Sequence, residues 1–166
     1  MRECFENLFS KRGSSFLYNS ELWSLTTTLE NEIDAFQRKL IRQNVLNIFW
    51  PRKVRNEEVY QATKNKPWSA TIRRRRLNWL GHIMRLEDDT PAKKAFYESL
   101  KPQKRKVGKP AQTWIKTIEN DLKLVDINLK IDNKTQPEVT IDFLKRYTND
   151  RLTWKKIVQD IMVGNH

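Results

Sequence analysis

The sequence has little cysteine, histidine and glycine, and it has no long hydrophobic run. Cys4 is the single cysteine, so no internal disulfide can form, and with only His82 and His166 available no zinc knuckle can form either. No stretch of about 18 apolar residues is present, which argues against a membrane span. Residues 1–16 lack the apolar run of a signal peptide. We therefore expect a nuclear or cytoplasmic protein, neither secreted nor membrane-bound, that binds no cofactor.

What the chain does have is aromatic residues and positive charge. Six Trp and seven Phe among 166 residues argue against disorder, because disordered chains are poor in aromatics. The net charge is +12, and it is concentrated: residues 69–109 hold 12 Lys and Arg against 4 Asp and Glu, which gives +8. A charge gathered in this way creates a local field that attracts polyanions. The composition therefore predicts a folded basic protein with a polyanionic partner.

The apolar spacing predicts an all-α fold of five to seven short helices. Thr27 and Glu30 form a capping-box pattern, and Leu29, Ile33, Phe36 and Leu40 then recur at helical spacing. Five later helices follow from caps and apolar spacing, and a core anchored by Trp79, Phe96, Trp114 and Trp154 is expected. The expected helices are 29–47, 57–63 with Asn56 as N-cap, 70–86, 92–100 after Thr90-Pro91, one from Pro110 to about Leu122, and 141–162, either unbroken or divided near Asn149.

Two segments do not fit a helix. Residues 101–110 contain two prolines, a glycine and five basic residues, and this pattern predicts an exposed loop. Residues 126–139 are polar and predict a linker, with a short strand at 129–131 as an alternative. The expected organisation is a tail at 1–15, a helical, basic nucleic-acid-binding region at 16–125, the linker, and a C-terminal helical segment at 140–166.

The chain contains four motifs, RLNWLGH, FLYNSELW, GKPAQTW and DRLTW. Together they resemble the region downstream of the polymerase palm in non-LTR (LINE-type) retrotransposon reverse transcriptases. The most specific is RLNWLGH at Arg76–His82, similar to the family's Arg-Leu-x-Trp-Leu-Gly-His signature. FLYNSELW at Phe16–Trp23, GKPAQTW at Gly108–Trp114 and DRLTW at Asp150–Trp154 resemble further family motifs and occur in the family's order. The resemblance implies that the first helices belong to the thumb, which lies against the template–primer duplex.

The catalytic motif of such an enzyme is missing from the sequence. A polymerase palm needs an aromatic-x-Asp-Asp turn, because paired carboxylates hold the two Mg²⁺ ions. The only Asp-Asp is Asp88-Asp89, which follows Leu86-Glu87 and precedes the Thr90-Pro91 helix start. Acidic residues are common at such starts. We therefore expect no enzymatic activity, and a palm, if there is one, would come from another chain.

The predicted function is binding of RNA, an RNA–DNA hybrid or DNA through phosphates, in a ribonucleoprotein. Gly81 is expected to permit the close approach of another helix or of a nucleic-acid backbone, and Trp79 to lie in the core. His82 is expected to pack on the helix and to form a hydrogen bond with a neighbour. The basic loop could track phosphates, act as a nuclear-localisation patch or be a solvated surface. The predicted contacts are Arg73, Arg74, Arg76, Arg85, Lys93, Lys94, Lys104, Arg105, Lys106 and Lys109.

Two alternatives stay open from the sequence. The chain could be a helical interaction module with no nucleic-acid ligand, or a fragment without function. A fragment that has lost its palm would expose an apolar patch, expected at Leu17, Leu22, Trp23 and Leu25.

Overall fold

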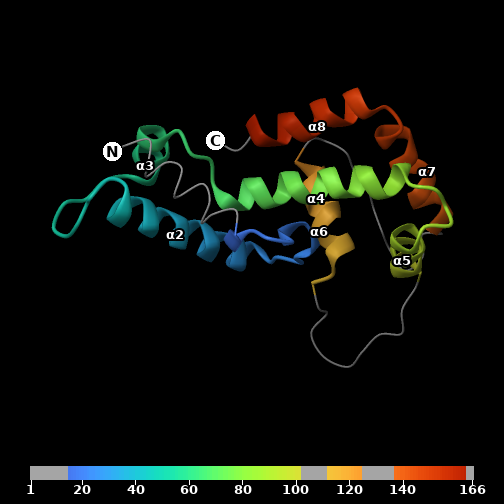
Figure 1. Ribbon diagram of the computed structural model, residues 1–166, viewed down its shortest axis with the longest axis horizontal. Coiled ribbons are helices and arrows are strands. Elements are labelled where there is room, and N and C mark those ends of the chain that lie inside the picture. The colour runs from blue at the N-terminus through green and yellow to red at the C-terminus, as the bar shows by residue number, and fades with distance from the viewer. Residues whose placement is uncertain (1–14, 102–111, 125–136, 164–166) are drawn as a thin grey trace. The chain divides into compact units, whose positions relative to one another are not determined.

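The computed structural model describes residues 15–101, 112–124 and 137–163, and within these ranges it is helical without any strand (Figure 1). The all-α fold predicted from the sequence is therefore confirmed. None of the helices in these ranges is long and apolar enough to cross a membrane. The elements are the 3-10 helix η1 (Ser20–Leu22) and the α-helices α2 (Thr27–Asn44), α3 (Asn56–Thr63), α4 (Trp68–Arg85), α5 (Pro91–Leu100), α6 (Trp114–Lys123), α7 (Pro137–Thr148) and α8 (Arg151–Val163).

The chain divides into two compact units, and the division falls inside α4. Unit 1 comprises residues 1–20 and 26–72, and unit 2 comprises residues 21–25 and 73–166. The sequence predicted a different organisation, with residues 140–166 as a segment apart. Instead, Leu144 of α7 and Trp154 of α8 share one core with α4, α5 and α6. The predicted linker is wrong at its end, because Pro137–Val139 begin α7; residues 126–136 and the alternative strand lie outside the described residues.

Helix α2 in unit 1 does not bury the predicted stripe. Leu29 and Phe36 are exposed, whereas Gln37 and Ile41 are buried. Phe36 nevertheless belongs to an aromatic cluster, with its ring centroid 5.8 Å from that of Phe16 and 6.3 Å from that of Trp68. The predicted apolar stripe is wrong because the buried face of α2 includes a polar residue, Gln37, which binds the backbone of Lys66 and Trp68.

Side chains of α2 cap the first turn of α4. The Ser69 backbone N–H and the Ser69 hydroxyl both donate to the Asp34 carboxylate, at 2.9 and 2.6 Å. The Trp68 N–H donates to Gln37 Oε1 at 2.8 Å, and Gln37 Nε2 donates to the Lys66 carbonyl at 2.9 Å. The first N–H groups of a helix have no partner within the helix. Residues more than 30 positions earlier in the chain therefore set where α4 begins.

Local side-chain caps start α2, α6 and α8, and some helix starts differ from the sequence prediction. Thr26, and not Thr27, caps α2 by accepting the Leu29 N–H. Asn56 is the first residue of α3 rather than its N-cap. Helix α6 begins at Trp114, with Thr113 as N-cap, so the predicted start at Pro110 is wrong. The Thr90-Pro91 start of α5 is confirmed.

A single hydrophobic core holds unit 2 together. Phe96 and Trp154 are buried in it, and Trp79 and Trp114 pack against it while keeping part of their surface exposed. Two of the four predicted anchors, Phe96 and Trp154, are thus buried in the core. The core consists of Leu77, Leu80, Ile83, Met84, Phe96, Leu100, Ile115, Ile118, Leu122, Leu144, Trp154 and Val158.

The C-terminal stretch is divided into two helices by a cap at Asp150. Its carboxylate accepts the backbone N–H groups of Leu152 and Thr153, at 3.0 and 3.2 Å, and the Thr153 hydroxyl. The Thr153 hydroxyl and these backbone groups lower the pKa of Asp150 below its usual value. Of the two arrangements left open by the sequence, the divided one is confirmed.

The predicted close approach at Gly81 is confirmed. A Cβ placed on Gly81 would lie 2.3 Å from Trp154 Nε1 and 2.5 Å from Trp154 Cδ1. The indole N–H of Trp154 donates to the Leu77 carbonyl at 3.0 Å. Helix α8 lies alongside the unit 2 part of α4 (Figure 1), and only a glycine allows the indole to reach this position.

Of the four residues predicted to form an exposed apolar patch, two are buried in the structure. Leu17 and Leu25 are buried and Trp23 is partly buried, while Leu22 is exposed. Residues 21–25 belong to unit 2, and two side chains of that unit bind their backbone. Trp114 Nε1 donates to the Glu21 carbonyl at 2.7 Å, and Arg76 Nη1 donates to the Trp23 carbonyl at 2.9 Å.

Candidate nucleic-acid interface

Two of the predicted phosphate contacts are structural arginines. Arg76 is fully buried and donates to Asp121 of α6, with 2.7 Å between Nε and Oδ2, and the largely buried Arg73 reaches Oδ1 of the same carboxylate at 3.1 Å. Buried charges are normally paired, because an isolated one is costly to remove from water. The prediction that Arg73 and Arg76 contact phosphates is therefore corrected: they fasten α6 to α4.

Lys93 is also buried rather than available to a ligand. Its ammonium donates to the carbonyls of Met84, at 3.2 Å, and Leu86, and it pairs with Asp88 at 2.8 Å. The last carbonyls of a helix have no partner within the helix, and a lysine can satisfy them. Lys93 thus closes the end of α4, and its predicted role in phosphate contact is corrected for the same reason as that of the two arginines.

The Asp88-Asp89 pair lies in the turn between α4 and α5. The hydrogen bond and charge of Lys93 lower the pKa of Asp88 below its usual value. Asp89 pairs with Lys94. Both carboxylates therefore serve local ion pairs in the turn. Among the described residues, no three His, Cys, Asp or Glu side chains gather into a group that could hold a metal ion.

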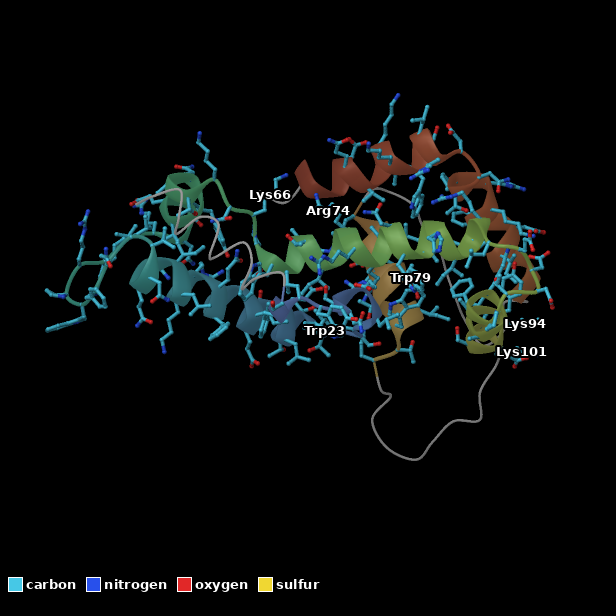
Figure 2. The ribbon with its side chains drawn as sticks, viewed as in Figure 1. Trp23, Lys66, Arg74, Trp79, Lys94 and Lys101 are labelled. Carbon is cyan, nitrogen blue, oxygen red and sulfur yellow. The ribbon has the colours of Figure 1, made fainter. Side chains whose placement is uncertain are left out.

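Several exposed cations of unit 2 already have carboxylate partners. Lys94 pairs with Asp89 and Lys101 with Glu98, both at α5 (Figure 2). On α6, burial alone would raise the pKa of Glu119, but hydrogen bonds and charge from two lysines lower it overall. These lysines are Lys116, 2.8 Å away, and Lys123, 3.0 Å away. Such paired cations contribute less field to the surrounding solvent than unpaired ones.

A different pattern occupies one face of α4, which we term the α4 stripe: Arg74, Asn78, His82 and Arg85. All four residues are exposed, and their spacing of 4, 4 and 3 positions places them on one side of the helix. The 18 residues of α4 include no Asp or Glu. Figure 2 shows Arg74 and Trp79 leaving α4 on different sides. The stripe is thus a polar, cationic face opposite the core.

The groups of the α4 stripe can all bind an anion. The side chain of Arg74 makes no hydrogen bond or ion pair with any other described residue. The His82 ring lies 5.3 Å, centroid to centroid, from the Trp79 ring of the same helix. This contact agrees with the packing predicted for His82, but its predicted hydrogen bond is not found among the described residues. Guanidinium, amide and imidazole groups all donate hydrogen bonds to phosphate oxygens. The stripe can therefore contact a polyanion at several points.

Arg85, at one end of the α4 stripe, interacts electrostatically with an arginine outside the stripe, Arg151. Arg85 Nη1 donates to the Thr148 carbonyl at 2.9 Å, which fastens it to the end of α7. Burial lowers the pKa of Arg85, and the positive charge of Arg151, at the start of α8, lowers it further. Two arginines that repel one another gain stability when an anion binds between or beside them. The Arg85 end of the stripe therefore carries a second positive charge, that of Arg151.

Sequence reasoning missed Arg151 for an identifiable reason. Residues 110–166 carry 9 Lys and Arg against 8 Asp and Glu, and the resulting +1 concealed the local arrangement. Asp150 is among these acids, yet its carboxylate is occupied by the N–H groups of α8. The sequence pattern that could have indicated this cationic face is the pair Arg151 and Lys155, four residues apart in a helical segment. Both residues are exposed in the structure.

Of the ten predicted contacts, Arg74, Arg85 and Lys94 are on the surface. The four of the basic loop, Lys104, Arg105, Lys106 and Lys109, lie outside the described residues. Comparisons with protein-family models, with curated proteins and with solved structures found no match to this chain.

Proposed function

We propose that the chain binds nucleic acid through its phosphates and performs no chemistry of its own. The observation that carries this proposal is the α4 stripe, which is exposed, cationic and on a helix without a carboxylate. The exposed Arg151 of α8 adds a further positive charge near its Arg85 end. Contacts of this kind position a protein on a strand without reading its sequence.

The length of the stripe suits several phosphates. Arg74 and Arg85 are 11 positions apart, which is about 16 Å along a helix that rises about 1.5 Å per residue. Phosphates of one strand of a duplex recur about every 3.4 Å along the axis. The stripe therefore spans about five phosphates of one strand. Arginine is suited to its two ends, because the guanidinium can bind one phosphate through two parallel hydrogen bonds.

The proposed ligand is an RNA or an RNA–DNA hybrid. The resemblance to the region downstream of the palm in LINE-type reverse transcriptases is the reason for this choice, since that region accompanies a template–primer duplex. A palm on a separate chain would then supply catalysis. The predicted basic-loop residues from Lys104 to Lys109 would extend the contact.

Fluorescence anisotropy tests the proposal. The full chain is titrated into labelled single-stranded RNA, an RNA–DNA hybrid and duplex DNA at two salt concentrations. We expect affinity to fall steeply with salt, because bound phosphates release counterions. Arg74→Glu and Arg151→Glu should weaken binding to all three ligands, and each should reduce the slope of log affinity against log salt by about one. Arg85 is left unchanged because it also binds the Thr148 carbonyl.

Lys123→Glu is the matched control. It makes the same change in net charge at an exposed position of the same unit, but Lys123 already pairs with Glu119. We expect it to change affinity much less than the two arginine variants. Equal losses for all three variants would indicate a general charge effect and would refute the stripe as the interface. Salt-independent binding, or none at low salt, would refute the proposed function.

A further inference from the structure

The loop between α2 and α3 presents two large aromatic side chains to solvent. Trp50 is 88% exposed and Phe49 is 60% exposed. Tryptophan is seldom so exposed, because burial of its ring is one of the larger contributions to folding. Among the described residues, neither ring belongs to the aromatic cluster of unit 1, which includes Phe16, Phe36 and Trp68. The pair therefore has no evident part in the core of unit 1.

The aromatic pair is followed in the loop by three positively charged residues. From Val45 to Arg55 the chain carries Arg52, Lys53 and Arg55 and not one Asp or Glu. All three cations are exposed. The first carboxylates, Glu57 and Glu58, come afterwards, on the first turn of α3. Exposed rings interleaved with cations are typical of surfaces that hold unpaired bases, since the rings stack on bases while the cations follow the backbone.

The loop is held in position by hydrogen bonds at both of its ends. Arg42 of α2 accepts the Ile48 N–H on its carbonyl at 2.8 Å, and its guanidinium donates to the Val54 carbonyl at 3.2 Å. Arg42 also donates to Asn56 Oδ1 at 2.8 Å. A tight turn encloses Trp50, because the Arg52 N–H donates to the Phe49 carbonyl at 3.0 Å. A ring presented on an anchored turn loses less conformational entropy on binding than one on a free chain.

We infer that Phe49 and Trp50, with Arg52 and Lys53, form a stacking site for unpaired bases of single-stranded nucleic acid. This inference rests on the proposed function and adds a second site within unit 1, with a different ligand chemistry. The α4 stripe binds phosphates alone, whereas the Phe49–Trp50 site requires bases. It favours single strands, because bases within a duplex already stack on one another and are not open to a protein ring.

The experiment compares two ligands of equal charge: a single-stranded oligonucleotide and the same strand with abasic positions in place of its bases. For the full chain we expect the base-bearing strand to bind about tenfold more tightly, as one stacked base contributes. Trp50→Ala should weaken binding to the base-bearing strand about tenfold and leave the abasic strand unchanged. Trp50→Phe should restore most of the difference, because it keeps an aromatic face.

Tyr18→Ala is the matched control, since Tyr18 is an aromatic residue of unit 1 that is 74% exposed. It should bind both strands as the unaltered chain does. Thermal unfolding of each variant verifies folding, and an unchanged midpoint is expected for Trp50→Ala because the ring is on the surface.

The outcomes separate this inference from the proposed function. If neither strand binds at low salt, the proposed function fails. If both strands bind equally well, or if Trp50→Ala weakens both equally, the stacking site is refuted while phosphate binding stands. Sedimentation with anionic lipid vesicles adds one further arm: binding to vesicles that depends on Trp50, without discrimination between the two strands, would assign the loop to a membrane surface and overturn the inference.

Discussion

Replacing Gly81 by alanine tests the packing of α8 on α4. The new methyl group would lie 2.3 Å from Trp154 Nε1, far inside van der Waals contact, so the indole has to move. Overpacking of a core costs about 1–3 kcal/mol, and loss of the Trp154–Leu77 hydrogen bond costs about 1 kcal/mol more. Alanine favours a helix over glycine by about 1 kcal/mol. The net expectation is a loss of about 1–3 kcal/mol in the free energy of unfolding.

Urea denaturation followed by far-ultraviolet circular dichroism measures this loss. Asn78→Ala is the matched control, because Asn78 is exposed on the same helix and its replacement changes helix propensity alone. We expect Asn78→Ala to be neutral or slightly stabilising. In the double variant Gly81→Ala/Trp154→Phe, the smaller ring should recover part of the stability lost by Gly81→Ala. A Gly81→Ala chain more stable than the unaltered one would refute the close approach, since helix propensity would then be the only effect present.

Three further predictions concern charged groups. Asp121→Asn should lower the free energy of unfolding by about 3 kcal/mol, because it removes the carboxylate shared by two buried arginines; a loss in urea denaturation below about 1 kcal/mol would contradict the assigned pairing. The lowered pKa values of Glu119 and Asp150 mean that their stabilising effect is present at neutral pH and is lost as the pH falls through their folded-state pKa values. The free energy of unfolding should therefore decrease as the pH is lowered, and it should decrease less in the variants Glu119→Gln and Asp150→Asn. If the variants lost stability with acid to the same extent as the unaltered chain, these two carboxylates would not be the cause. Lys93→Met should speed amide hydrogen exchange at the end of α4, because the buried ammonium no longer holds two terminal carbonyls; unchanged exchange there would show that Lys93 does not close the helix.

Most of the helices follow from the sequence, because each has a local cause. Thr90-Pro91 and the apolar spacing after it gave α5 nearly as observed. Helices α2 and α4 were expected with ends that differ by only a few residues from the observed ones. Residue 81 as a point of close approach also followed from the sequence, since a glycine within a helical stripe is otherwise costly.

The sequence did not show which basic residues are buried in ion pairs and which are exposed. Four consecutive arginines spread around a helical turn, and nothing local says which of them meet a carboxylate. Asp121, 45 positions after Arg76, decides that Arg73 and Arg76 are buried and leaves Arg74 on the surface. Charge counting along the chain therefore overestimated the number of cations available to a ligand.

The helical class, the concentration of positive charge and the positions of the locally capped helices can be predicted from the amino-acid sequence, because they depend on neighbours within a few residues. Features that depend on distant partners are seen only in the folded chain. Asp34 and Gln37 set the start of α4, Asp121 withdraws two arginines from solvent, and Arg42 fixes the loop that presents Trp50. Each of these is a polar group satisfied across a long sequence separation, and no local pattern in the chain specifies its partner.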